Sequence, residues 1–123
     1  MTCFALYLCA MLVVQPCAEY WLHRLAHAFH LHTHVSHHAL YHNKRFPTYS
    51  GNTCTWCVII GLALAQQWLL CAMVLQYEVV HTFSHRQKAF YMHEHHAMHH
   101  KAATCNYGVS AAWPDAVFGT RAQ

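Results

Sequence analysis

The stretch from His93 to His100, His-Glu-His-His-Ala-Met-His-His, decides the kind of fold that this chain can adopt. Within it, His96, His99 and His100 have the spacing H-x-x-H-H. Positions i, i+3 and i+4 of a helix share one face, so these three imidazoles can converge on one point. The stretch therefore predicts a helix that presents histidines from one side.

The same spacings occur elsewhere in the chain. An H-x-x-x-H pair stands just upstream, and an H-x-x-x-H pair followed by H-x-x-H-H occurs in the first half. Because one ion cannot use ten imidazoles, two matched sets of five indicate a site for two metal ions. His30 and His32 fall off the pattern and are expected to be peripheral. His93 and His95 are left out, because the register of His95 and His96 is open by one residue. The expected ligands are His23, His27, His34, His37, His38, His81, His85, His96, His99 and His100.

Imidazole ligands narrow the choice of metal. Neutral imidazole offers a nitrogen lone pair at physiological pH and suits iron, zinc and copper. Iron with open coordination positions can activate dioxygen, whereas zinc polarises a substrate or activates water. With four acidic residues in the whole chain, a carboxylate-rich soluble di-iron bundle is excluded. The alternative to an organised metal site is a histidine-rich segment that buffers or transports zinc, but such segments usually lack a recurring spacing.

The composition is that of a membrane protein. Hydrophobic residues make up 56% of the chain and charged residues only 9%, against about 25% in ordinary soluble domains. A length of 123 residues predicts one domain, residues 1–123. The net charge of +3, without a basic stripe, argues against a nucleic-acid partner.

The first apolar segment, Cys3 to Leu22, is about long enough to cross a bilayer of ~30 Å. A signal peptide is the competing interpretation, weakened by the lack of basic residues before the apolar run. We expect Pro16 to kink this helix and Tyr20 and Trp21 to lie at the membrane interface.

The second apolar segment, Thr53 to Val80, raises a question of topology. A single crossing would carry His81 and His85 to the side of the membrane opposite the first histidines, yet the segment is too short for two full crossings. A short hairpin that turns near Gln66 and Gln67 resolves this. The alternative is that the two halves serve different sites or subunits. Basic residues flank the histidines, which predicts a cytoplasmic site: Arg24, Lys44, Arg45, Arg86, Lys88 and Lys101.

Four polar residues are candidates for outer contacts to the ligands: Glu19, Glu78, Asn106 and Asp115. Glu19 precedes His23 by one turn and either takes its second imidazole proton or pairs with Arg24 or solvent. Asp115 either fixes a ligand histidine or Lys101, or caps a short helix. Asn106 is expected to shape a turn over the metal site.

The motifs together extend from Glu19 to Thr120. They combine the histidine spacing with a closing tail that is less repetitive. In order they are His23-Arg-Leu-Ala-His27, His34-Val-Ser-His37-His38, Tyr77-Glu78-Val-Val-His81-Thr-Phe-Ser-His85, His95-His96-Ala-Met-His99-His100, Asn106-Tyr107-Gly108-Val109 and Asp115-Ala-Val-Phe118-Gly119-Thr120.

In these motifs the chain resembles the fatty acid hydroxylase/sterol desaturase superfamily of integral-membrane dimetal oxygenases. The resemblance implies an all-α fold of membrane helices with a cytoplasmic histidine-rich cap, in the endoplasmic reticulum membrane if the source is eukaryotic. It implies two iron ions, with zinc as a possible substitute, and dioxygen and two electrons used to hydroxylate or desaturate a lipid C–H bond. The electrons would come from cytochrome b5 or a ferredoxin-type protein.

The substrate stays open among fatty acyl chains, sterols and carotenoids. Carotenoid hydroxylases have a similar order of clusters, but the tail favours the fatty acid and sterol branch. A non-catalytic membrane metal-binding protein is the alternative from another class. The chain is shorter than typical members with four membrane helices, and Pro114 separates Trp113 from Asp115, where the family has Trp directly before Asp. Three interpretations follow: the chain is a minimal member of the family, a fragment, or part of a homo-oligomer that completes the membrane domain.

Overall fold

All regular elements in the described part of the chain are helices, as the sequence predicts. The structure is a computed structural model that describes residues 2–42 and 52–122. Most of the polar loop expected at Asn43–Asn52 lies outside these ranges. In chain order the elements are α1 (Cys3–Cys9), the π-helix η1 (Ala10–Val14), α2 (Gln15–Ala28), α3 (His32–His42), α4 (Asn52–Leu64), α5 (Trp68–Arg86), α6 (His93–Lys101) and α7 (Trp113–Val117).

The first three elements form one continuous helix. Within the described residues, Phe4–Ala28 is the helix long and apolar enough to cross a bilayer, judged by length and composition. The irregularity expected at Pro16 takes the form of the π-helical turn, in which the Gln15 N–H donates to the Ala10 carbonyl. A wider turn accommodates Pro16 because its ring would crowd a carbonyl one regular turn back.

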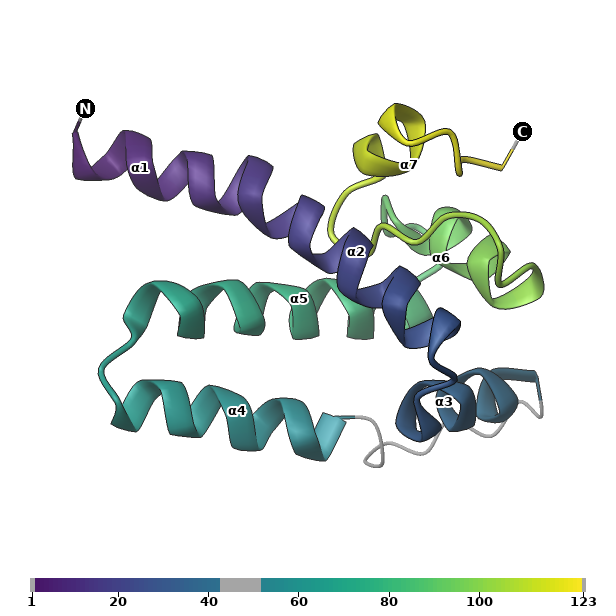
Figure 1. Cartoon of the computed structure of the whole chain (residues 1–123), viewed down its shortest axis with the longest axis horizontal. Helices are drawn as coiled ribbons and strands as arrows, with labels where there is room; N and C mark the ends of the chain where they lie inside the picture. The colour runs from purple at the N-terminus through teal and green to yellow at the C-terminus, as the bar shows by residue number, and fades with distance from the viewer. Residues whose placement is uncertain (1, 43–51, 123) are drawn as a thin grey trace.

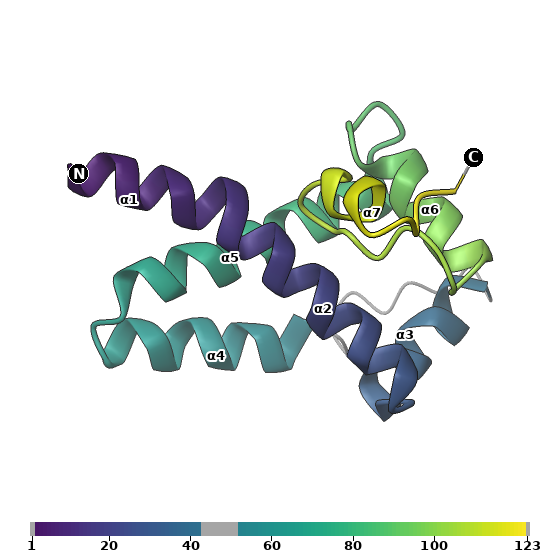
Figure 2. The same cartoon turned by 45° about the horizontal axis from the view of Figure 1, so that its top comes forward.

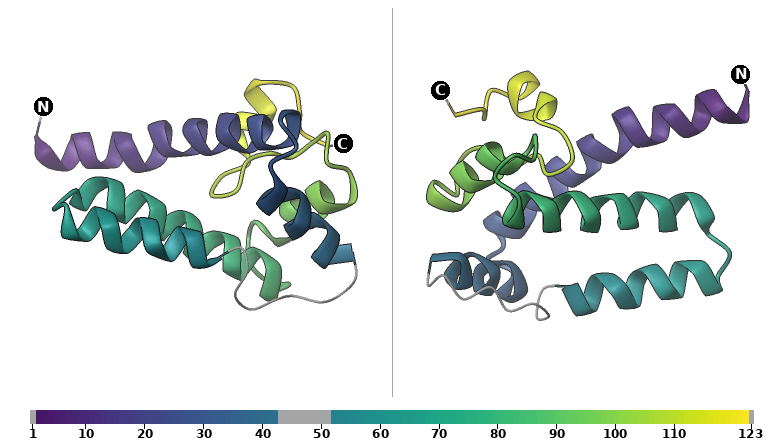
Figure 3. Two further views of the ribbon diagram at one scale, coloured as in Figure 1. Left: turned by 60° about the horizontal axis from the view of Figure 1, so that its bottom comes forward. Right: turned by 180° about the vertical axis from the view of Figure 1, so that it is seen from behind.

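The hairpin expected from the topology is confirmed. Helices α4 and α5 run antiparallel, side by side, joined by a tight turn (Figure 3). Gln66 adopts φ 57°, and two backbone hydrogen bonds close the turn: Gln66 N–H to Ala63 over 3.0 Å and Gln67 N–H to Leu62 over 2.8 Å. Such a left-handed residue after a helix caps its last carbonyls, so the chain reverses within three residues.

The hairpin brings the two histidine-bearing halves to one end of the molecule. The N-terminus and the α4–α5 turn lie at one end, and α3, α6 and α7 gather at the other (Figure 1). Helix α2 crosses over α5 on its way to that end, as the turned view in Figure 2 also shows. His81 and His85, at the C-terminal end of α5, therefore lie at the same end as His23 and His27.

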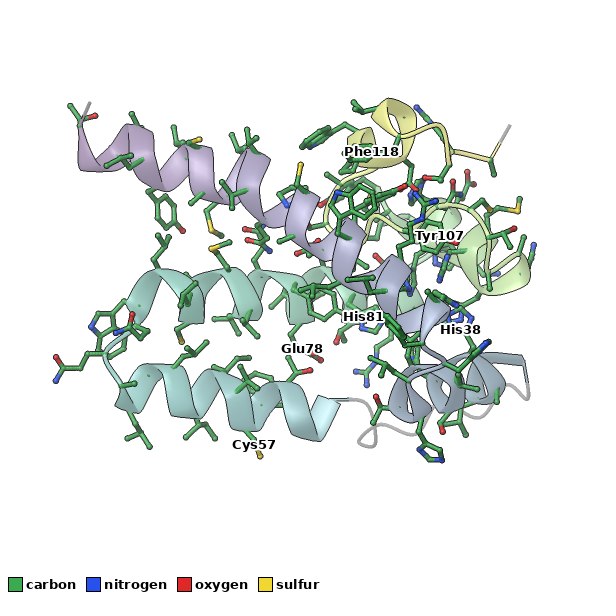
Figure 4. The ribbon with its side chains drawn as sticks, viewed as in Figure 1. His38, Cys57, Glu78, His81, Tyr107 and Phe118 are labelled. Atoms are coloured by element: carbon green, nitrogen blue, oxygen red, sulfur yellow. The ribbon has the colours of Figure 1, made fainter. Side chains whose placement is uncertain are left out.

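The C-terminal tail packs against α2 through aromatic rings. Tyr20 is fully buried, with its ring 4.8 Å from that of Phe118 and 5.8 Å from that of Tyr107. Trp21 is 45% exposed, and its ring lies 5.2 Å from that of Phe118. The tail therefore covers the Tyr20 ring, and Figure 4 shows Phe118 and Tyr107 of the tail beside α2. The position of Tyr20 and Trp21 at the membrane interface stays a prediction.

Candidate metal centre

The histidines gather into two neighbouring sets. The ligand atoms within each set all lie within 4.8 Å of one another. Helices α3 and α6 contribute to both sets, whereas α2 serves the first and α5 the second. The first set is His23, His27, His34, His38 and His99, and the second set is His37, His81, His85 and His96.

The Nε2 atoms of the first set face one another. His27 Nε2 lies 2.8 Å from His34 Nε2 and 2.9 Å from His99 Nε2. The further distances are 3.1 Å from His23 to His34 and 3.2 Å from His99 to His38. Nitrogen ligands about 2.1 Å from an ion and at right angles to each other are about 3 Å apart. The spacing therefore fits several ligands of one ion.

The second set has the same spacing around His85. Its Nε2 lies 3.1 Å from those of His37 and His81 and 2.9 Å from that of His96. His81 and His85 are four residues apart on α5, so their rings share one face of that helix. This set also fits one ion.

His100 lies where the two sets meet. Its Nε2 is 3.1 Å from that of His96, and its ring centroid is 4.3 Å from that of His38 and 4.8 Å from that of His37. The structure thus brings all ten expected ligand histidines together at one end of the fold. Ligation by these residues stays a prediction.

Two backbone carbonyls fix ligand histidines from behind. His23 Nδ1 lies 2.6 Å from the Tyr107 carbonyl oxygen, and His99 Nδ1 lies 2.7 Å from that of Cys105. A carbonyl only accepts, so each Nδ1 must carry the proton, and the Nε2 lone pair of each neutral ring faces the first set. That tautomer is the one needed for metal ligation through Nε2.

Burial keeps these imidazoles neutral. Burial, assisted by the neighbouring histidines, lowers the pKa of His34 from 6.5 to about 3 and that of His38 to about 2. Burial also lowers the pKa of His37 to about 4. It lowers the pKa of His99 to about 4, although the hydrogen bond that His99 donates to the Cys105 carbonyl acts in the opposite direction. A crowded set of deprotonated imidazoles is prepared for a cation.

Asp115 organises the tail and is fully buried. Its Oδ1 accepts hydrogen bonds from the Tyr107 N–H and the Thr120 hydroxyl, each of 2.7 Å, and its Oδ2 accepts from the Gly108 N–H over 2.7 Å. His95 Nε2 lies 3.0 Å from the same Oδ2. Burial alone would raise the pKa of this carboxyl, but these hydrogen bonds outweigh it and hold the pKa below its ordinary value. Asp115 therefore neither caps α7 nor meets Lys101, and it reaches the ligands through Tyr107.

His93 and His95 lie outside both sets. His93 Nδ1 is 2.7 Å from the Ser84 carbonyl oxygen, and His95 faces Asp115. The register left open in the sequence is therefore the one in which His96 joins the ligand candidates. Asn106 shapes a turn as expected, with φ 55°, donates to the His95 carbonyl over 3.2 Å and accepts from the Ala122 N–H over 2.8 Å.

Glu19 and Glu78 contact groups other than the ligand histidines, contrary to expectation. Glu19 accepts from the backbone N–H and the hydroxyl of Ser110, over 3.0 and 2.5 Å, and from the Gln15 amide over 2.7 Å. The Tyr107 carbonyl takes the His23 proton in its place. Glu78 accepts from the hydroxyls of Thr82 and Thr55 and so links α5 to α4.

A groove of about 410 Å³ between α2 and α5 leads to the first set. Apolar side chains of both helices form most of its wall, and His23 and His34 stand in it as well. Gln15 and Glu19 add a polar stretch along α2. The groove therefore brings apolar side chains of α2 and α5 next to the histidine cluster. Its lining includes Ala18, Leu22, Leu70, Met73 and Val74.

The comparison with protein families agrees with this geometry. Residues 8–120 match the family model described as fatty acid hydroxylase. The chain belongs to the fatty acid hydroxylase family. Neither the search of curated proteins nor the search of solved structures found a match.

In this fatty acid hydroxylase family member, sequence reasoning missed the backbone carbonyls of Tyr107 and Cys105. Every residue has a carbonyl, so no residue type marks one that meets a histidine. The nearest signal was the Asn106-Tyr107-Gly108 turn itself, because a left-handed Asn redirects the backbone. The groove was missed as well, since it is formed by two helices far apart in the chain.

Proposed function

We propose that this chain is a membrane-bound non-haem di-iron oxygenase that hydroxylates or desaturates a C–H bond of a lipid. The observation that carries the proposal is the groove between α2 and α5, which runs along apolar side chains and ends at His23 and His34. An apolar substrate in this groove would meet the histidine cluster at that point. Family membership supports a reaction of this kind.

The groove supports a lipid substrate on physical grounds. Leu22, Leu70, Met73 and Val74 offer an acyl or polycyclic chain a wall without charges. Each methylene buried there contributes about 0.8 kcal/mol. A chain held along α2 and α5 would present one of its C–H bonds at the histidine end.

Two bound irons would supply the activation of dioxygen and the oxidation of the C–H bond, with zinc as a redox-inert substitute. Hydroxylation balances as RH with O₂, two electrons and two protons giving ROH and H₂O. Desaturation takes the same inputs and gives a C=C bond and two H₂O. The ten histidines would hold the ions, and the carbonyls of Cys105 and Tyr107 keep His99 and His23 in the tautomer that ligation needs. We infer an electron donor of the cytochrome b5 or ferredoxin type.

We infer that the histidine end faces the cytoplasm. Arg24, Arg86, Lys88 and Lys101 all stand beside the histidine clusters in the chain. Positive residues are enriched on the cytoplasmic side of membrane proteins. In a eukaryotic cell the corresponding membrane is that of the endoplasmic reticulum.

The proposal is tested by lipid analysis of cells that express the chain. We expect hydroxylated or newly unsaturated lipids with the wild type and none with His96→Ala. His32→Ala is the matched control, because His32 is exposed and stands outside both sets. Product in carotenoids alone would favour the carotenoid branch. Metal loading with no change in any lipid class would contradict the proposed enzymatic activity and support a non-catalytic metal-binding protein.

A further inference from the structure

We propose that the two ion positions are inequivalent, and that the tail from Cys105 to Thr120 makes the first set hold its ion more tightly than the second. The inference rests on the dimetal site of the proposed function but on no substrate or reaction. It assigns the tail a role in metal retention, with Asp115 as the positioning residue.

Both backbone carbonyls of the tail that accept a hydrogen bond from a ligand candidate contact histidines of the first set. Cys105 and Tyr107 stand two residues apart, yet they meet histidines from different helices, His99 of α6 and His23 of α2. In the second set, His96 Nδ1 is buried and has no hydrogen-bond partner among the described residues. The tail thus supports one set from two sides.

An outer acceptor strengthens a histidine ligand in two ways. It fixes the proton on Nδ1, so that Nε2 keeps its lone pair, and it holds the ring in its ligating orientation. Loss of such a contact commonly reduces metal affinity by about 10–100-fold. A set with two such contacts should therefore release its ion more slowly than a set whose buried His96 has none.

Asp115 holds the two carbonyls in place. It binds the Tyr107 and Gly108 N–H groups, which follow Cys105 in the chain, and the hydroxyl of Thr120 at the end of the tail. The backbone is close at this point, since a Cβ on Gly108 would lie 2.2 Å from the Ala111 carbonyl oxygen and 2.8 Å from Asp115 Oδ2. A weakened Asp115 network would let both carbonyls move away from their histidines.

The test uses the purified full chain loaded with Co²⁺, whose visible spectrum reports ligation, and then mixed with excess EDTA. We expect two phases of Co²⁺ loss, of about one ion each, with rates that differ by about tenfold or more. In His27→Ala the slow phase should be lost, and in His81→Ala the fast phase. A single phase that releases both ions overturns the inference, as does the opposite assignment.

Variants of the tail test its role. Thr120→Val removes one hydrogen bond to Asp115 and should speed the slow phase several-fold, and Asp115→Asn should speed it by about 10–100-fold. The fast phase should keep its rate in both. Glu94→Gln, an exposed carboxylate on α6, is the control and should change neither phase. Equal acceleration of both phases by Thr120→Val, with unchanged helix content, would show a general structural role and contradict the inference.

The outcome is separate from that of the proposed function. Two unequal phases in a chain that changes no lipid would support the inequivalent ion positions and contradict the proposed enzymatic activity. A lipid-modifying chain with one common phase would do the reverse.

Discussion

His23 on α2 donates its Nδ1 proton to the carbonyl oxygen of Tyr107, 84 residues further along the chain, over 2.6 Å. This contact joins the first ligand candidate to the closing tail. It places the turn of Asn106, Tyr107 and Gly108 against the histidine cluster. Asp115 stabilises that turn by accepting a hydrogen bond from the Tyr107 N–H. The tail is therefore part of the architecture of the site.

Gly108→Ala should destabilise the protein by about 1–3 kcal/mol, because the added methyl group would overlap the Ala111 carbonyl and crowd Asp115. Thermal unfolding of the detergent-solubilised chain measures the effect. Gly61→Ala is the matched control: nothing lies within 4 Å of its new Cβ, and it sits inside α4, where alanine should stabilise by up to about 1 kcal/mol. Equal effects of the two substitutions would contradict the close approach at Gly108.

Ala18→Phe should fill the groove beside Glu19 and Leu22 and reduce lipid turnover at least tenfold, while the metal content stays that of the wild type. The reason is steric, since the new ring occupies the space of the substrate chain. Product formation and metal content are measured on the same preparation. Ala28→Phe, on the exposed end of α2 outside the groove, is the control. Unchanged turnover by Ala18→Phe would rule the groove out as the substrate path.

The metal-free chain should lose stability as the pH falls from about 6.5 to about 4. The pKa values of His34, His37 and His99 are lowered from 6.5 to about 3, about 4 and about 4, chiefly by burial. Between those limits each of these three histidines binds a proton in the unfolded chain but stays neutral in the folded one, so acid favours unfolding. The contribution of these three histidines to stability is fully present above pH 6.5. Urea unfolding at pH 7.5, 6 and 5 measures it, and a stability that is constant or rises toward pH 5 would refute this explanation.

Ser110→Ala should cost about 1–3 kcal/mol of stability and leave metal content unchanged. It removes the hydroxyl that Glu19 accepts and leaves a buried carboxylate with one donor fewer. Glu19 touches Ser110 and Gln15 and not His23, so the ions should be retained. Thermal unfolding and metal analysis test both halves. Loss of metal in a folded Ser110→Ala chain would restore Glu19 as an outer partner of the site.

The sequence was sufficient for the longer helices and for the grouping of the histidines, but not for the short helix α7. The spacing of His96, His99 and His100 predicts a helix face directly. The length of an apolar segment without charges predicts the length of its helix. The hairpin at Gln66 was predicted from topology, since one site shared by both halves requires the chain to bring His81 back to the histidine end. Local sequence gave no glycine to mark that turn; Gln66 takes the left-handed conformation instead.

Contacts between distant residues were not accessible in the same way. Glu19 and His23 share a helix face, which made their contact a reasonable expectation. The outcome was decided by the approach of Ser110 and Tyr107 from the far end of the chain. The burial of Tyr20 could not be predicted either, because the ring that covers it, Phe118, comes from the tail.

The iron content of the purified chain tests the dimetal site most directly. The full chain is loaded anaerobically with Fe²⁺, freed of loose ions by gel filtration, and analysed for iron and protein. Two irons per chain are expected from the two histidine sets, falling to one in His27→Ala and to one in His81→Ala. One iron or none per wild-type chain, with its helix content intact, would contradict the dimetal site.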